Sequence, residues 1–173
     1  GTVLFRSGYP QPLAVEDPSA YQAILGGMTE SALRSVRLVR TATRTFEASN
    51  ARGGRLTLGE GADAHFTPVE LLLAAIAGCS AIDVDYLTSR RAEPDVFEAS
   101  ASATKLSDDK GNHLGEVTVD FRISFPTGLR GDAARERLVP AVTRSRDRLC
   151  TVSRTVQLST PVRFQLGGED APA

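Results

Sequence analysis

The sequence is poor in the residues that characterise several classes of binding protein. Tryptophan is absent and aromatic residues make up 6% of the chain, which argues against a surface on which nucleic-acid bases stack. The formal net charge is -1, so bulk electrostatic attraction to nucleic acid or to an anionic membrane is not expected. We therefore expect neither nucleic acid nor a membrane as a partner.

Cysteine and histidine are also scarce. The two cysteines, Cys79 and Cys150, are too few for a disulfide framework in a chain of 173 residues. The two histidines, His65 and His113, lie near neither cysteine in sequence, and there is no CxxC pair. We expect no metal ion and no other cofactor.

Long apolar runs are missing as well. The longest, Leu71–Ile82, is internal and shorter than a membrane span needs, so it predicts neither a transmembrane helix nor a signal peptide. Hydrophobic residues still make up 41% of the chain, enough for the core of one domain. We expect a cytoplasmic protein whose thiols are normally reduced.

The N-terminal region differs in character from the rest. Residues 1–30 contain Pro10, Pro12 and Pro18 and show no helical or strand period, which indicates an irregular arm. This arm is either an extension or an ordinary packed part of the fold. We predict a domain over residues 31–168 and a polar tail over 169–173.

Strands are predicted on both sides of a central helical segment. Residues 35–50 are rich in β-branched residues, and Arg55–Leu58 follows a glycine turn. Val96–Leu106 and Glu116–Phe125 are separated by SDDKGN, which is typical of a hairpin connection. A last strand is predicted over Thr160–Leu166.

The central helix has clear start signals. Thr67 is a candidate N-cap, Pro68 occupies the first helical position and Glu70 completes a capping box. The helix should run from Pro68 to about Arg90 and be buried on all sides, because its middle is apolar around the whole circumference.

A second helix should be capped by Asp132 and bent by Pro140, and Cys150 either ends it or begins a further short helix. Strands, a helix, a hairpin, helices and a strand in this order indicate an α+β fold with antiparallel pairing.

The residues around the two cysteines do not decide whether each thiol is a packing residue or a reactive group. A cysteine in an apolar helix is more often a small packing residue than a reactive one, and Cys79 is too far from the helix N-terminus for the helix dipole to lower its pKa much. A reactive Cys79 would need a nearby arginine. Three arginines, Arg144, Arg146 and Arg148, precede Cys150, and we expect them on the solvated side of the helix.

Two motifs together resemble one family. TPVELLLAAIAGCSAIDV, followed much later by RDRLCTVSRTV, is similar to the OsmC/Ohr family, which comprises osmotically inducible protein C and organic hydroperoxide resistance proteins. The resemblance covers about residues 35–166. The amino-acid sequence around Cys79 is closer to that of a third subgroup, the OsmC-like proteins, than to those of the two named branches.

The resemblance implies a fold and an activity. Members are intertwined homodimers in which antiparallel curved sheets wrap around buried central helices. They are thiol-dependent peroxidases that act on organic hydroperoxides without a cofactor. Cys79 would be the peroxidatic thiol and Cys150 the resolving thiol, and a dithiol donor such as a lipoylated protein would reduce the resulting disulfide.

Members of this family also use an arginine to stabilise the thiolate and a glutamate to hold that arginine. Arg44 is the closest match for the arginine, with Arg40 and Arg52 as alternatives. Val69 occupies the position of the glutamate, and Glu70 next to it is either catalytic or only a helix cap. Small-ligand binding without catalysis, or redox sensing, is the alternative function.

Overall fold

The computed structural model describes residues 33–171, so the predicted arm over residues 1–30 and the last two residues lie outside the described part of the chain. The elements occur in the predicted order and form an α+β fold. They are β1 (Arg37–Ala42), β2 (Thr45–Ser49), β3 (Arg55–Leu58), α2 (Pro68–Thr88), β4 (Val96–Asp108), β5 (Gly111–Ser124), α3 (Leu129–Arg144), a π-helical segment η1 (Ser145–Leu149), α4 (Thr151–Gln157), β6 (Gln165–Leu166) and β7 (Glu169–Asp170).

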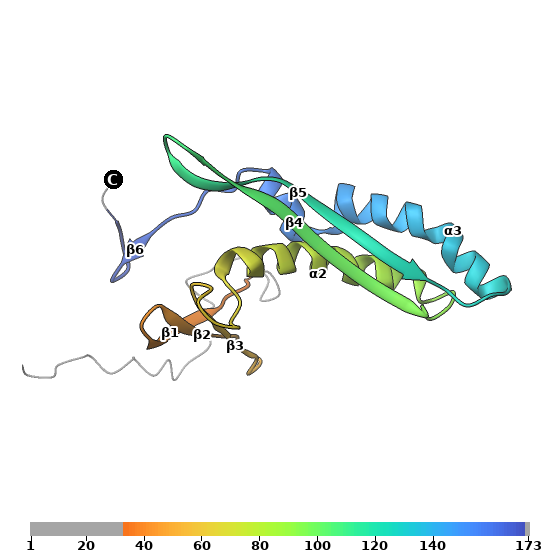
Figure 1. The fold of residues 1–173 in the computed structure, drawn as a ribbon, viewed down its shortest axis with the longest axis horizontal. Helices are drawn as coiled ribbons and strands as arrows, with labels where there is room; N and C mark the ends of the chain where they lie inside the picture. The colour runs from red at the N-terminus through yellow and green to blue at the C-terminus, as the bar shows by residue number, and fades with distance from the viewer. Residues whose placement is uncertain (1–32, 172–173) are drawn as a thin grey trace, which may run out of the picture.

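All strand pairing within the three sheets is antiparallel, as predicted. Strands β1, β2 and β3 form one sheet, and β4 pairs with β5 in a long hairpin. The hairpin lies along α2 and α3, which run in opposite directions, whereas the β1–β3 sheet lies beside the N-terminal end of α2 (Figure 1). The predicted 35–50 segment is thus a tight hairpin rather than one strand.

The hairpin turns one face toward the helices because apolar and polar residues alternate along β5. Val117, Val119, Phe121 and Ile123 are half-buried, and the residues between them are exposed. Phe121 meets Phe97 of β4 edge to face, with the ring centroids 6.5 Å apart. Where the hairpin ends, a small core of Ala92, Phe125 and Ala134 joins β5 to α3.

Helix α2 begins with the predicted capping box. The Thr67 hydroxyl accepts a hydrogen bond from the Glu70 amide at 3.2 Å, and the Glu70 carboxylate accepts one from the Thr67 amide at 2.7 Å. The hydrogen bonds from Thr67 lower the pKa of Glu70, so this cap is intact at neutral pH and weakens as acid protonates the carboxylate. The cap fixes where α2 starts and therefore which helix face Cys79 occupies.

Thr67→Ala is expected to lower the free energy of unfolding by about 1 kcal/mol, since it leaves an amide of the first turn without its side-chain acceptor. Urea denaturation at one fixed protein concentration measures this loss. Thr127→Ala is the control, because Thr127 is exposed and its side chain makes no hydrogen bond within residues 33–171, and its effect should stay within about 0.5 kcal/mol. Equal losses in both variants would contradict the importance of the cap.

The prediction that α2 is buried on every side is wrong for the single chain. Helix α2 packs against α3, β4, η1 and α4 on one side only, where Ile76, Val84 and Thr88 are buried. Ile82 and Tyr86 on the opposite side are 72% and 60% exposed. One chain supplies too few elements to cover the helix all round.

Helix α2 also corrects an expectation about membrane spans. The apolar run Leu71–Ile82 alone is shorter than a span needs. The complete helix Pro68–Thr88 is long and apolar enough to cross a membrane by length and composition, a test that core helices of soluble proteins also pass. Its packing against the neighbouring helices and the hairpin favours a core helix.

Two predicted element starts change. Helix α3 begins at Leu129 after Gly128, whose φ of 107° favours glycine, and Asp132 is not the cap but lies in the first turn and pairs with Arg135. The predicted strand over 160–166 shortens to β6, which, among the residues that the structure describes, pairs only with β7, within the predicted polar tail. Pro140 lies inside α3 as predicted.

Candidate functional site

Two segments far apart in the sequence bring the thiols together. Cys79 lies in the middle of α2, and Cys150 is the N-cap residue of α4, the second of its two predicted placements. The Cys150 thiol is buried and donates toward the carbonyl of Ile76, one turn before Cys79, at 3.9 Å. It also accepts a hydrogen bond from the Ser153 amide at 3.4 Å. Both cysteines are free thiols.

Cys79 lies near this same cap. The thiol of Cys150 and the backbone N–H groups of Thr151 and Val152, at the start of α4, all influence the pKa of its thiol. The two cysteines suggested by the sequence motifs are therefore neighbours in the fold.

The environment of Cys79 disfavours its thiolate in the single chain. Burial is the largest cause and raises the pKa of the Cys79 thiol above its ordinary value. The amide of Val152 and, more weakly, that of Thr151 lower the pKa, whereas the neighbouring thiol of Cys150 raises it further. The net shift is upward, so this thiol is protonated at neutral pH, and no cation of the described residues contributes to its titration.

A hydrogen bond between helices fixes the segment that carries Cys150. Ser145, which is almost fully buried at the start of η1, donates from its hydroxyl to the carboxylate of Asp83 on α2 at 2.8 Å. The Cys150 amide in turn donates to the Ser145 carbonyl at 3.0 Å. Sequence reasoning missed this connection, although an aspartate directly after a long apolar run was a signal that a buried partner would be required.

Arg44 and Glu70 do not contact Cys79 within the chain. Arg44 occupies the turn between β1 and β2 with a φ of 56°, and its guanidinium binds both carboxylate oxygens of Glu60 at 3.2 and 3.1 Å. Glu70 uses its carboxylate in the helix cap, which agrees with the capping interpretation. Glu60 was not singled out from the sequence, because no spacing rule links a loop carboxylate to an arginine sixteen residues earlier.

The remaining arginines of interest are at the surface. Arg40 donates to the hydroxyl of Thr43, and Arg52 is exposed in the turn before β3. The arginines before Cys150, at positions 144, 146 and 148, are exposed as predicted. Within residues 33–171 no group of three or more metal-binding side chains is present.

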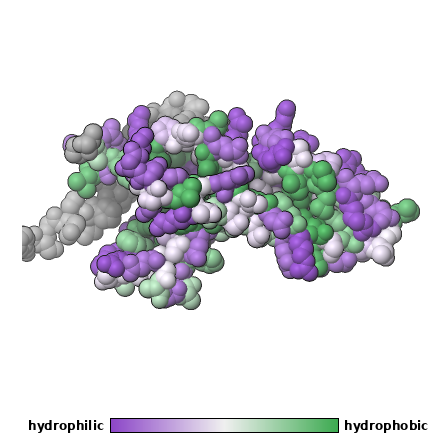
Figure 2. Space-filling model, turned by 45° about the horizontal axis from the view of Figure 1, so that its top comes forward, coloured by the Kyte–Doolittle hydropathy of each residue, from purple (hydrophilic) through white to green (hydrophobic). Residues whose placement is uncertain are grey.

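An apolar stripe runs along the uncovered side of α2 and includes Cys79. Its members, Leu72, Ala75, Cys79, Ile82 and Tyr86, are spaced alternately by three and four residues. This spacing is typical of a helix face that packs against another helix. Figure 2 shows apolar side chains, in green, open to solvent on the surface of the single chain.

Comparison with known proteins agrees with this architecture. The family model of OsmC-like proteins matches residues 59–165. Uncharacterised proteins of Mycobacterium bovis and Mycobacterium tuberculosis are 34% identical over 131 residues, which cover 73% of this chain and 91% of each relative. The chain therefore belongs to the OsmC-like protein family.

Solved structures share the fold at low sequence identity. A hypothetical protein of Aquifex aeolicus matches with a TM-score of 0.59 and 23% identity, covering 74% of this chain and 89% of its own. An OsmC-like protein of unknown function from Vibrio cholerae matches with a TM-score of 0.61 and 11% identity, covering 73% of this chain and 94% of its own. An organic hydroperoxide resistance protein of Legionella pneumophila matches with a TM-score of 0.50 and 18% identity, covering 73% of this chain and 91% of its own.

Proposed function

We propose that the protein is a thiol-dependent peroxidase that reduces organic hydroperoxides. The observation that carries the proposal is the proximity of Cys79 and Cys150, two thiols from distant segments that lie near the start of α4. Membership of a family that includes hydroperoxide resistance proteins supports the same chemistry.

The reaction needs only the two thiols and a dithiol. The Cys79 thiolate attacks the terminal oxygen of the hydroperoxide, the O–O bond breaks, and the alkoxide leaves and takes a proton to become the alcohol. Cys79 is oxidised to a sulfenic acid. The Cys150 thiol then attacks the Cys79 sulfur, which releases water and forms a disulfide. A dithiol donor, which a lipoylated protein would supply in the cytoplasm, reduces the disulfide by exchange.

A largely apolar cavity beside Cys150 suits an organic hydroperoxide. Its volume is about 540 Å³, and it lies between α2, β5 and the segment from α3 to α4. Ile76 and Ser153 in its wall both contact the Cys150 thiol, and Val119, Phe121 and Val142 make much of the wall apolar. Hydrogen peroxide gains little from such a wall, so the cavity favours a substrate with a hydrocarbon part.

We further propose that the active form is a homodimer built on the α2 stripe. Pairing two copies would cover the exposed apolar side chains of Ile82 and Tyr86 and would surround α2 on both sides. Cys79 lies within this stripe, so the thiol would then face the second chain. Dimerisation therefore changes the environment that sets its pKa.

The second chain is the proposed source of the missing cation. Burial and the neighbouring thiol of Cys150 raise the pKa of Cys79, and Arg44, which pairs with Glu60, does not contribute to the titration of this thiol within the chain. Arg44 brought to Cys79 by the second chain would favour the thiolate, because a nearby positive charge lowers a thiol pKa. In this arrangement Glu60 orients Arg44, the role for which the sequence suggested Glu70.

Cys150→Ser tests the assignment of the two thiols. Without a resolving thiol, one equivalent of cumene hydroperoxide should convert Cys79 to a stable sulfenic acid, which dimedone traps and peptide mass spectrometry locates. Wild-type protein should give a Cys79–Cys150 disulfide and little dimedone adduct. An adduct on Cys150 of the wild type, or no adduct in the variant, would contradict the assignment.

The raised thiol pKa favours one alternative, a redox sensor whose thiols react without efficient turnover. In that case the Cys79–Cys150 disulfide would form slowly with peroxide and would not be recycled by a dithiol. Native mass spectrometry of the purified protein distinguishes ligand binding, since a retained small molecule would add mass to the folded chain.

A further inference from the structure

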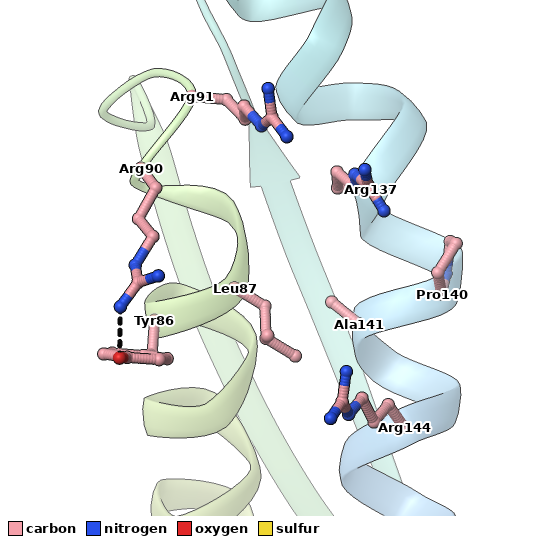
Figure 3. Close-up of a pocket in the computed structure, with 8 residues that line it drawn as sticks. All are labelled: Tyr86, Leu87, Arg90, Arg91, Arg137, Pro140, Ala141 and Arg144. Carbon is pink, nitrogen blue, oxygen red and sulfur yellow. Dashed lines mark hydrogen bonds between the residues drawn. The ribbon is translucent and has the colours of Figure 1, made fainter.

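A second pocket, separate from the thiols, lies between the C-terminal end of α2 and α3. We propose that it binds a compact polyanion, namely a phosphate or diphosphate group. Its volume is about 240 Å³, and Figure 3 shows the side chains that line it. The lining residues are Tyr86, Leu87, Arg90, Arg91, Arg137, Pro140, Ala141 and Arg144, of which four are arginines.

The spacing on α3 places two of these arginines on the side of the helix that faces α2, and both side chains remain exposed to solvent. Arg137 and Arg144 are two helical turns apart and lie on the same helix face as Ala141. Ala141 is buried, so this is the inward side of α3. Arg144 extends from α3 toward α2, and Arg91 extends from the end of α2 toward α3 (Figure 3).

Three of the guanidinium groups have no acidic partner. Within residues 33–171, neither Arg91, Arg137 nor Arg144 forms a side-chain hydrogen bond or an ion pair. Carboxylates elsewhere in this part of the chain do pair with arginines, as Arg44, Arg55, Arg122, Arg135 and Arg146 show. The positive charge of the pocket is therefore left uncompensated by the protein.

Arg90 is positioned differently from the other three. Its guanidinium stacks on the Tyr86 ring, 4.3 Å from the centroid, and donates to the Tyr86 hydroxyl. This contact fixes Arg90 along α2, at the rim of the pocket. Arg90 is therefore already engaged by a neighbouring side chain, and the other three guanidinium groups are left for a ligand.

Helix dipoles explain part of this arrangement but not all of it. Arg91 follows the end of α2, where the partial negative charge of a helix C-terminus favours a cation, whereas α3 continues from Arg144 directly into η1. Arg137 lies in the middle of α3, where the dipole gives no such benefit. Like charges in one pocket repel one another, and a bound anion converts this repulsion into attraction.

Guanidinium chemistry selects the class of anion. The planar guanidinium group of arginine forms bidentate hydrogen bonds to two oxygens of a phosphate. Several guanidinium groups around one small pocket favour an anion with more than one negative charge. A singly charged carboxylate would satisfy only one of the three. The pocket contains neither cysteine, so binding there does not depend on the proposed peroxidase activity.

Isothermal titration with sodium pyrophosphate as the probe tests the site on the full-length protein. Arg137→Gln and Arg144→Gln should each weaken binding by about tenfold, the loss expected for charge-assisted hydrogen bonds. Arg122→Gln is the control, because Arg122 is exposed on β5 and pairs with Glu98, and it should bind like the wild type. Circular dichroism confirms that each variant is folded.

Two further arms identify the source of the phosphate. Inorganic phosphate tests the free ion, and adenosine diphosphate tests a diphosphate carried by a larger molecule. Tighter binding of the nucleotide than of pyrophosphate assigns the pocket to a phosphorylated metabolite, and equal affinity assigns it to the free anion. Wild-type protein that binds neither pyrophosphate nor the nucleotide, or an equal loss in Arg122→Gln, would overturn the proposal.

Discussion

Cys79→Ser is expected to abolish organic hydroperoxide reduction, with a fall in kcat/KM of a thousandfold or more, on the order seen when an enzyme loses its nucleophile. Serine keeps the size of the side chain but its hydroxyl does not ionise at neutral pH and does not attack the O–O bond. Stopped-flow measurement with cumene hydroperoxide and a dithiol as reductant gives the rate.

The loss should be specific to the thiol. Serine fits the volume of Cys79 in α2, so the circular dichroism spectrum and the free energy of unfolding should change little. Cys150→Ser is the matched variant, and in it the first, single-turnover oxidation of Cys79 should persist while dithiol-dependent turnover falls. Turnover by Cys79→Ser within tenfold of the wild type would contradict the assignment of the nucleophile.

Mixing two inactive variants is expected to restore activity. Arg44→Gln chains keep Cys79 but lack the cation, and Cys79→Ser chains keep Arg44 but lack the nucleophile. If Arg44 acts across the dimer, each mixed dimer contains one complete site, so a mixture unfolded and refolded together should recover about a quarter of wild-type activity, assuming random pairing. If Arg44 acted within its own chain, no mixed dimer would contain a complete site.

The control for this experiment is the same mixture without refolding, which should stay inactive as long as the dimers do not exchange. Sedimentation measurements establish that each variant remains dimeric. An inactive refolded mixture of correct mass would contradict activation of the thiol by Arg44 of the second chain.

The pH dependence of alkylation reports the same contact. In Arg44→Gln, only burial, the neighbouring thiol and the amides of Thr151 and Val152 act on Cys79, and together they raise its pKa. Its thiolate should then appear only above the ordinary thiol range near 8.5. In the wild-type dimer Arg44 favours the thiolate, so the midpoint of Cys79 alkylation by iodoacetamide should lie at lower pH. Coincident midpoints would contradict the contact.

Local rules predicted the parts of the fold that depend on neighbouring residues. The capping box at Thr67 and Glu70 fixed the start of α2 because it is a contact over three residues. The alternation in β5 predicted its buried face for the same reason. The N-cap of α3 was misplaced because Gly128 starts the helix by its backbone conformation, and Asp132 has a partner in Arg135.

Local sequence rules did not predict that Cys79 and Cys150 are neighbours in the fold. Composition favoured packing for Cys79, and only the resemblance carried by two separate motifs linked it to Cys150. Contacts such as Asp83 with Ser145 and Arg44 with Glu60 join residues whose separation in sequence follows no period. Burial of α2 was overestimated because an apolar circumference shows that a helix will be covered, but not whether the cover comes from its own chain.

The most direct test of the proposed peroxidase is the intact mass and thiol content of the reduced protein after one equivalent of cumene hydroperoxide. We predict that both thiols disappear together, that the chain loses two hydrogens, and that peptide mapping finds a disulfide between Cys79 and Cys150. One cumyl alcohol should form per chain. Two thiols still titratable after the peroxide is added, with no alcohol formed, would contradict it.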